Sequence, residues 1–204
     1  ANTQPALLCV STATQKVLQK KFNLPVSFTA GHSIGEYASL VLSGVIPFST
    51  AIKAVRLRGE AMQKAVPVGA GGMIAVLGLN EKQVQILCAW AEKESGEKPL
   101  QAANYNCPGQ IVLSGNLKGL NFIREHFKPE SVDAEAFQNT KRVKFIPLNV
   151  SAPFHCSMMK PAQEAMKNFL TPIEFSTPII PVVQNLSARV ETNPSTIKQN
   201  LIAQ

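Results

Sequence analysis

The sequence predicts an α/β protein in which a larger α/β layer carries a smaller inserted subdomain. Strand-like and helix-like patterns alternate along the 204 residues, and a proline followed by three glycines marks a boundary at residues 67–72. Beyond that boundary the order is strand, helix, strand, strand, helix, strand, which is the ferredoxin-like order. We therefore assign residues 69–147 to the insert, and residues 1–68 and 148–204 to the core.

Each element of the core follows from apolar spacing and from its terminal residues. Apolar residues at helical spacing predict the first helix, a short β-prone run predicts a strand, and Gly44 ends the next helix. Ser49 or Thr50 is expected to cap the helix that follows. In chain order, the expected core elements are a helix at 5–22, a strand at 26–30, a helix ending near 43, a helix at 50–66, a helix at 157–170, a strand at 180–184 and a helix from 194.

The insert is built from four strands and two helices with a polar connection before the last strand. The polar stretch at 128–140 lacks a clear apolar period, so we expect a loop there. In chain order, the expected insert elements are a strand at 73–79, a helix at 81–94, strands at 100–104 and 110–114, a helix at 117–127 and a strand at 143–148.

Composition excludes several classes of protein and leaves a globular one. Hydrophobic residues make up 45% and charged residues 16%, which is incompatible with a disordered or collagen-like chain. The net charge of +7 favours anionic partners. No short window concentrates Lys and Arg, and no aromatic residues interleave with them, so nucleic acid is not an expected partner.

The cysteines and the apolar runs indicate the cellular compartment in which we expect the protein. The four cysteines are far apart and have no zinc-site spacing, so we expect reduced thiols and no metal site. No apolar run reaches the length of a membrane span, and no signal peptide opens the chain. We expect a monomer in the cytoplasm, or in an organelle after removal of a transit peptide. Both ends lie in helical patterns, so a longer natural protein is also expected.

The segment Gly31-His32-Ser33-Ile34-Gly35 is a G-x-S-x-G sequence between an apolar strand and a helix. In that context the glycines permit a tight turn that lifts the Ser33 hydroxyl clear of the sheet as a nucleophile. The Ile34 N–H then lies at a helix N-terminus, where it would bind an oxyanion. The alternative is a tight turn in which Ser33 only caps the helix.

A serine nucleophile needs a base, and the chain offers three histidines. His155 follows a predicted strand and precedes a helix, so we predict it as the base, with a structural histidine as the alternative. His32 points the wrong way along the turn, and His126 is expected on the surface. The single aspartate, Asp133, lies in the polar stretch of the insert, so an amide or a carbonyl is expected to orient His155, which argues against a standard esterase.

Arg58 falls in the middle of the apolar face of the predicted 50–66 helix, whereas Arg56 faces water. A buried guanidinium must be paired, because an isolated buried charge is costly. Arg58 would hold a substrate carboxylate near Ser33 through its planar fork. The alternative is an internal salt bridge, for example to Glu36.

Together these motifs make the sequence resemble the malonyl-CoA:acyl carrier protein transacylases of fatty-acid synthesis, over nearly the whole chain and in order. The matching segments are Gln4-Pro5-Ala6-Leu7, Gly31 to Tyr37, Arg58-Gly59 with Met62-Gln63, Asn104-Tyr105-Asn106 with Gly109-Gln110, and Pro153 to Cys156 with Met159-Lys160-Pro161.

The resemblance implies acyl transfer in two steps through a Ser33 acyl-enzyme. Malonyl-CoA would be the acyl donor, with no permanently bound cofactor, and the phosphopantetheine thiol of an acyl carrier protein would be the acceptor. His155 would move the proton, Arg58 would hold the malonyl carboxylate, and the Gln204 carbonyl would orient His155. The implied fold is an α/β-hydrolase-like core with a parallel sheet and a ferredoxin-like insert.

The family also has a first strand with a Gly-Gln-Gly loop and a C-terminal part that have no counterpart in these residues, which is a second reason to expect a longer protein. Two other functions remain open at this point. A serine hydrolase would release the acyl group to water, and a non-catalytic carrier-protein docking module would not acylate Ser33.

Overall fold

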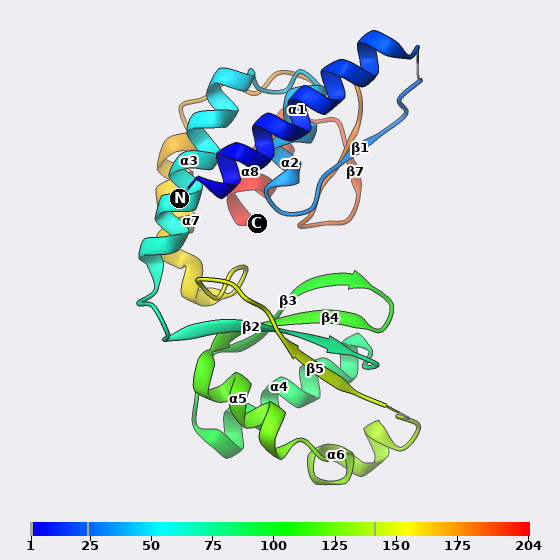
Figure 1. The fold of residues 1–204 in the computed structure, drawn as a ribbon, viewed down its shortest axis with the longest axis vertical. Coiled ribbons are helices and arrows are strands. Elements are labelled where there is room, and N and C mark those ends of the chain that lie inside the picture. Colours follow the sequence, from blue (N-terminus) through cyan, green and yellow to red (C-terminus); the bar gives the residue numbers. More distant parts are fainter. Residues whose placement is uncertain (1, 24, 141) are drawn as a thin grey trace. The chain divides into compact units, whose positions relative to one another are not determined.

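The structure, a computed structural model, describes residues 2–23, 25–140 and 142–204. It is a mixed α/β fold, as expected, and it divides into two compact units (Figure 1). Unit 1 comprises residues 1–61 and 162–204, and unit 2 comprises residues 62–161. Unit 2 thus extends beyond the 69–147 range assigned to the insert from sequence, at both ends.

Unit 1 combines helices with a small three-stranded sheet. In the sheet order β1-β6-β7, β1 pairs with β6 in parallel, and β6 pairs with β7 antiparallel. The elements are α1 (Thr3–Lys21), β1 (Thr29–Ala30), α2 (Gly35–Leu42), most of α3 (Phe48–Ala65), most of α7 (Lys160–Leu170), β6 (Val182–Val183), β7 (Val190–Glu191) and α8 (Pro194–Ala203).

The core of unit 1 forms where α2, α3, α7 and α8 contribute apolar side chains to one cluster. Burial of such side chains is the main favourable contribution to folding. The fully or nearly fully buried members include Tyr37, Leu40, Ile46, Leu170 and Ile197. This cluster therefore fixes the N-terminal half of α2, where the G-x-S-x-G turn ends.

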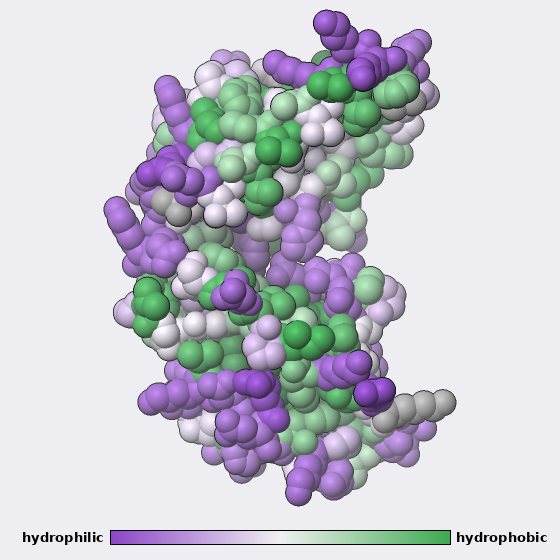
Figure 2. Space-filling model, viewed as in Figure 1, coloured by the Kyte–Doolittle hydropathy of each residue, from purple (hydrophilic) through white to green (hydrophobic). Residues whose placement is uncertain are grey.

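Helix α1 buries little of its apolar surface within the described residues. Only Leu8 and Thr12 are buried, although the apolar spacing that predicts this helix also includes Val10, Val17 and Leu18. Figure 2 shows hydrophobic surface beside the hydrophilic end of α1. The apolar period thus located the helix correctly, but most of its apolar side chains are exposed.

Unit 2 is built on a four-stranded antiparallel sheet in the order β3-β4-β2-β5. Central strands β2 and β4 pair over their full length, from Gly71 opposite Asn116 to Leu77 opposite Gln110. The elements are β2 (Gly71–Leu77), α4 (Glu81–Ser95), β3 (Leu100–Cys107), β4 (Gln110–Asn116), α5 (Leu117–His126), α6 (Pro129–Phe137), β5 (Lys144–Pro147) and the 3₁₀ helix η1 (Ser157–Met159).

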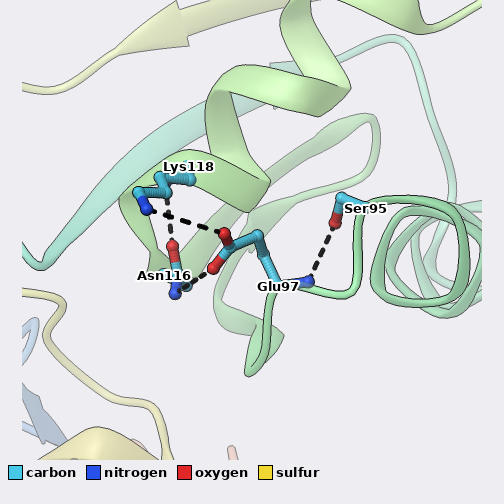
Figure 3. Close-up of polar contacts among 4 residues, drawn as sticks. All are labelled: Ser95, Glu97, Asn116 and Lys118. Carbon is cyan, nitrogen blue, oxygen red and sulfur yellow. Dashed lines mark hydrogen bonds and ion pairs between the residues drawn. The ribbon is translucent and has the colours of Figure 1, made fainter.

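Helices α4 and α5 pack against the sheet of unit 2 through an apolar cluster that includes Val76, Leu87, Leu113 and Leu120. A polar group fastens the turn after α4 to the start of α5 (Figure 3). The Glu97 carboxylate accepts a hydrogen bond of 2.8 Å from Asn116 Nδ2 and lies 3.9 Å from Lys118 Nζ, and the Glu97 N–H donates to Ser95 Oγ at 3.1 Å.

The expected loop at 128–140 is wrong, because residues 129–137 form α6. The helix is interrupted at Asp133, which has an extended backbone, and the Asp133 carboxylate accepts a hydrogen bond of 2.9 Å from the Ala136 N–H. Asp133 thus caps the second helical turn, as carboxylates at such positions do. The short pieces lack a clear apolar period, which is why the sequence pattern missed them.

Three further boundaries differ from expectation. Helix α3 begins at Phe48, so neither Ser49 nor Thr50 is its cap, and the 157–170 helix opens with the 3₁₀ turn η1. Strands β1 and β6 cover only two residues each, and β7 was not expected at all. No helix in the described ranges is long and apolar enough to cross a membrane.

Candidate active site

The Ser33 turn has the strand-turn-helix geometry that its sequence predicts. Strand β1 ends at Ala30, α2 begins at Gly35, and Ser33 between them has a left-handed backbone with φ of 52°. A non-glycine residue pays about 1–2 kcal/mol for that conformation, so the surrounding contacts must hold it there. Such strain is typical of a nucleophile held at a tight turn.

The two glycines of the motif play different roles. A Cβ built on Gly31 would lie 2.0 Å from the backbone carbon and oxygen of Gly35, so this position excludes every side chain. A Cβ on Gly35 meets nothing within 4 Å. Only the first glycine is therefore required by the close approach within the turn, although the motif predicts the same role for both.

The Ile34 N–H lies at the start of α2, as expected for an oxyanion-binding amide. None of the hydrogen bonds described for this turn uses that N–H, whereas the Ser33 N–H donates to Asn185 Oδ1 at 2.9 Å. An amide without an internal acceptor at a helix N-terminus is suited to a negatively charged oxygen.

Arg58 is buried on α3, with 6% of its surface exposed, and its guanidinium reaches the Ser33 hydroxyl. Its Nη2 donates to Ser33 Oγ at 3.1 Å, and its Nη1 donates to Gln4 Oε1 at 2.8 Å. Both partners are neutral. The sequence thus placed Arg58 correctly on the apolar face, and Arg56 is exposed with an ion pair to Glu60.

No ion pair among the described residues involves Arg58, so the expected alternative of a salt bridge to Glu36 is not found there. The guanidinium carbon lies 6.0 Å from the centre of the Tyr37 ring, which adds a cation–π contact. Burial lowers the pKa of Arg58, and the nearby Tyr37 and Glu36 oppose that change. A buried cation with neutral partners is arranged to receive an anion from outside.

Tyr37 follows Glu36 in the first turns of α2, and its ring is almost fully buried. Burial raises the pKa of Tyr37 to about 12, while the positive charge of Arg58 acts in the opposite direction. Tyr37 therefore stays neutral beside the guanidinium at ordinary pH and provides no negative charge to it.

His155 lies in unit 2, in the loop between β5 and η1. It has a left-handed backbone with φ of 59°, and among the described non-glycine residues only Ser33 and Ala188 share a positive φ. Pro153 packs on β2, where a Cβ on Gly71 would lie 2.4 Å from the proline ring, and the Ser157 N–H donates to Gln101 Oε1 of β3 at 2.7 Å. The loop is thus fixed on both sides of His155.

Gln204 ends α8 in unit 1, and its side chain points to the Ser33 turn. Its Nε2 lies 3.5 Å from the Ser33 carbonyl oxygen and 3.4 Å from Glu36 Oε2, which is the long end of hydrogen-bond distance. The role that the resemblance implies for the Gln204 carbonyl, toward His155, stays a prediction.

The other two histidines, His126 and His32, are exposed. His126 is exposed on α5 and stacks on Phe122, with ring centres 4.3 Å apart, which confirms a surface position. His32 is exposed in the turn. Within the described residues, no three His, Cys, Asp or Glu side chains come together as a metal site.

Asn185 and Gln4 are the residues of this site whose contacts the sequence did not indicate. Asn185 comes from the segment after β6 and Gln4 from the first turn of α1, and both contact groups at or beside Ser33. Asn185 lies 152 positions from Ser33 in the chain, and no local pattern signals such a contact. Gln4 belongs to a segment of the family resemblance, but its role had no local signal either.

Known proteins resemble this chain over almost its whole length. The family model for the acyl transferase domain matches residues 1–201. The malonyl CoA-acyl carrier protein transacylase of Staphylococcus aureus (strain COL) is 43% identical over 203 residues, covering 100% of this chain and 61% of that protein. This chain therefore spans about three fifths of the length of that relative.

Solved structures resemble the fold over almost the whole chain. The acyl-carrier-protein S-malonyltransferase of Burkholderia pseudomallei 1710b has a TM-score of 0.85 at 38% identity, over 99% of this chain and 62% of its own. A type II PKS acyl-carrier protein in complex with its malonyl-transacylase gives 0.84 at 38% identity, over 98% and 61%. On the match of 201 residues to the family model, the chain belongs to the acyl transferase domain family.

Proposed function

We propose that the protein transfers a malonyl group from coenzyme A to the phosphopantetheine thiol of an acyl carrier protein in fatty-acid biosynthesis. The observation that carries this proposal is the 3.1 Å contact between Arg58 Nη2 and Ser33 Oγ. It places a buried cation with neutral partners beside a hydroxyl on a strained turn. An acyl group with a free carboxylate would give this cation a negatively charged hydrogen-bond partner.

In the first half-reaction, the Ser33 oxygen attacks the thioester carbonyl carbon and gives its proton to His155. The Ile34 N–H stabilises the oxyanion, and Arg58 leaves the hydroxyl to hold the malonyl carboxylate. The carbon–sulfur bond then breaks, and His155 returns the proton to the coenzyme A thiolate. In the second half-reaction, the carrier thiol attacks the Ser33 ester by the same steps in reverse.

The pairing of Ser33 with His155 rests on the family resemblance. We also propose that the Gln204 carbonyl orients His155, since the single aspartate of the chain caps a turn of α6 instead. A neutral orienting group would stabilise the imidazolium less than a carboxylate does.

The finer fold assignment belongs to the same proposal. Unit 1 would be part of an α/β-hydrolase-like core, since its parallel β1–β6 pair leads into the serine turn. Unit 2 would be a ferredoxin-like subdomain, because its strand order β3-β4-β2-β5 is the one expected for that fold. In this proposal residues 69–147 form the insert, and residues 1–68 and 148–204 form the core.

The net charge of +7 suits the phosphates of coenzyme A and an acidic carrier protein.

The test is acylation of the intact protein. Incubation with malonyl-CoA, followed by mass spectrometry, should place one malonyl group on the peptide that contains Ser33. Ser33→Ala should abolish the adduct, and Ser11→Ala, which removes an exposed hydroxyl from α1, should not. Addition of a phosphopantetheinylated carrier protein should move the malonyl group to its thiol. Release as free malonate instead would indicate a hydrolase, and no adduct would contradict the proposal.

A further inference from the structure

We propose that Asn185, held by the buried carboxylate of Glu36, is a positioning residue that fixes the backbone of the Ser33 turn for acyl transfer. The inference rests on the proposed function of Ser33 and deepens it. Asn185 follows β6 and lies outside both the G-x-S-x-G sequence and helix α2.

The Asn185 amide bonds to the turn on both sides of His32. Its Oδ1 accepts from the Ser33 N–H at 2.9 Å, and its Nδ2 donates to the Gly31 carbonyl at 2.7 Å. One planar side chain thus engages the residue before and the residue after His32, in the manner of a strand partner. These two bonds restrain the backbone where Ser33 takes its left-handed conformation.

Glu36 holds Asn185 in place from the interior of unit 1. Only 1% of Glu36 is exposed, and its Oε2 accepts from the Asn185 N–H at 2.8 Å and also from Asn185 Nδ2. The other oxygen, Oε1, accepts from Gln184 Nε2 at 3.1 Å, and Asn200 Nδ2 donates to Gln184 Oε1 at 2.7 Å. A buried carboxylate with donors on both oxygens is held in one orientation.

The partners determine which way the Asn185 amide faces. The Ser33 N–H can only donate, so it requires the amide oxygen, whereas the Gly31 carbonyl and the Glu36 carboxylate can only accept. An aspartate has almost the same shape but would put an oxygen opposite both acceptors. Asn185→Asp therefore breaks the arrangement without changing the volume of the side chain.

The bond to Asn185 also makes the two N–H groups at the tip of the turn differ in their hydrogen bonding. It occupies the Ser33 N–H and leaves the Ile34 N–H outside the described hydrogen bonds. Asn185 thus fixes the direction of the amide proposed for the oxyanion and the direction of the Ser33 hydroxyl together. Its loss should slow the chemical step more than the binding of the acyl donor.

The experiment measures single-turnover acylation of the intact protein by malonyl-CoA, in the wild type, Asn185→Asp and Asn185→Ala. At saturating malonyl-CoA the acylation rate constant should fall on the order of 10²-fold in Asn185→Asp, while half-saturation changes by less than about threefold. The control is Asn193→Ala, which removes the cap of α8, where Asn193 Oδ1 accepts from the Ser195 N–H at 2.9 Å. It should lower the melting temperature and leave the acylation rate constant unchanged.

A double-mutant cycle tests the route through Glu36. If Glu36 acts on the turn through Asn185, Glu36→Gln should slow acylation in the wild type but add little in the Asn185→Ala background. Additive losses would overturn the link between the two residues. Should Glu36→Gln fail to fold, the Asn185 variants still decide the main claim, because Asn185 is exposed.

A fluorophosphonate, which reacts with an activated serine whatever the acyl donor, separates this inference from the proposed function. Wild-type protein that labels at Ser33 but takes no malonyl group would contradict malonyl transfer, and the labelling rates of the Asn185 variants would still test the positioning role. An acylation rate constant in Asn185→Asp within about twofold of the wild type, or slowing that merely follows the loss of folded protein as in Asn193→Ala, would overturn the positioning role.

Discussion

Gln4 Oε1 accepts a hydrogen bond of 2.8 Å from Arg58 Nη1, so a neutral amide from the first turn of α1 orients the buried guanidinium. A carboxylate at the same place would orient Arg58 equally well and would also neutralise it. The choice of an amide keeps the positive charge available. This neutral partner of Arg58 comes from a residue 54 positions away in the chain.

Gln4→Glu should therefore weaken malonyl transfer while leaving the fold intact. The new carboxylate would form a salt bridge with Arg58 and compete with the malonyl carboxylate, which we expect to lower kcat/KM for malonyl-CoA by about 10- to 100-fold. A glutamate is favoured near a helix N-terminus, so α1 should not lose stability.

The control for that variant is Gln19→Glu, which makes the same change at an exposed position of the same helix. It should transfer malonyl groups at the wild-type rate. Equal malonyl kinetics in both variants would show that the Gln4 amide is not what leaves the guanidinium charge available.

Arg58→Ala should change the preferred acyl donor. Loss of the charge removes the partner of the malonyl carboxylate but leaves Ser33 in place, so kcat/KM for malonyl-CoA should fall by about 10- to 100-fold relative to acetyl-CoA. Competition between the two donors, with the Ser33 adduct identified by mass, measures the ratio. Arg56→Ala is the matched control, since it removes an exposed arginine from the same helix, and an unchanged ratio in Arg58→Ala would exclude Arg58 as the carboxylate site.

The parts of this fold that could be predicted from sequence are those with a repeating local signal. Helices such as α4 and α5 and strands β2 and β4 have long apolar periods, and Arg58 was placed correctly because it interrupts such a period. Strands β1, β6 and β7 have only two residues each, so their pairing depends on distant residues and leaves no local period.

The site also contains residues that a local sequence signal predicts and residues that it does not. The Ser33 turn has a local signature because Gly31 must leave room for the Gly35 backbone, whereas His155 has a left-handed backbone without any comparable signature. Asn185 was missed because its contacts join residues 149 to 154 positions apart. That Asp133 does not orient His155 stays a prediction, and its capping role within α6 could not be read from a stretch without an apolar period.

His155→Ala should slow acylation of Ser33 by about 10³-fold, as expected when a serine loses its general base. The rate is measured as the appearance of the malonyl adduct on the Ser33 peptide. His126→Ala, which removes an exposed histidine stacked on Phe122, should acylate at the wild-type rate. A His155→Ala protein that acylates normally would rule out this histidine as the base.

The two glycines of the serine turn should respond in opposite ways to alanine. Gly31→Ala forces a Cβ to within 2.0 Å of the Gly35 backbone, so we expect a loss of stability of about 3 kcal/mol or more, or a failure to fold. Gly35→Ala meets no atom within 4 Å and replaces glycine at the start of α2, so we expect a gain of up to about 1 kcal/mol.

Urea denaturation of the intact protein measures both changes, and the Ser33 acylation rate follows function. Gly35→Ala should retain that rate, which would show that the second glycine of the motif is not needed for the turn. A stable Gly31→Ala protein with full activity would contradict the close approach of residues 31 and 35.

Tyr37 should make the protein lose stability at high pH. Its pKa is raised from 10.0 to about 12 by burial, so the folded chain keeps a proton that the unfolded chain releases first. The stabilising contribution is complete below about pH 10 and declines as the pH rises toward 12, because the unfolded state then binds fewer protons. A rise of this size corresponds to about 2–3 kcal/mol.

Urea denaturation at about pH 9 and pH 11 measures this decline in stability, which should be smaller in Tyr37→Phe than in the wild type. The control is Tyr105→Phe, which alters a ring that is 54% exposed and should retain most of the decline. A decline of equal size in Tyr37→Phe and in the wild type would show that the Tyr37 hydroxyl does not retain its proton in the folded protein.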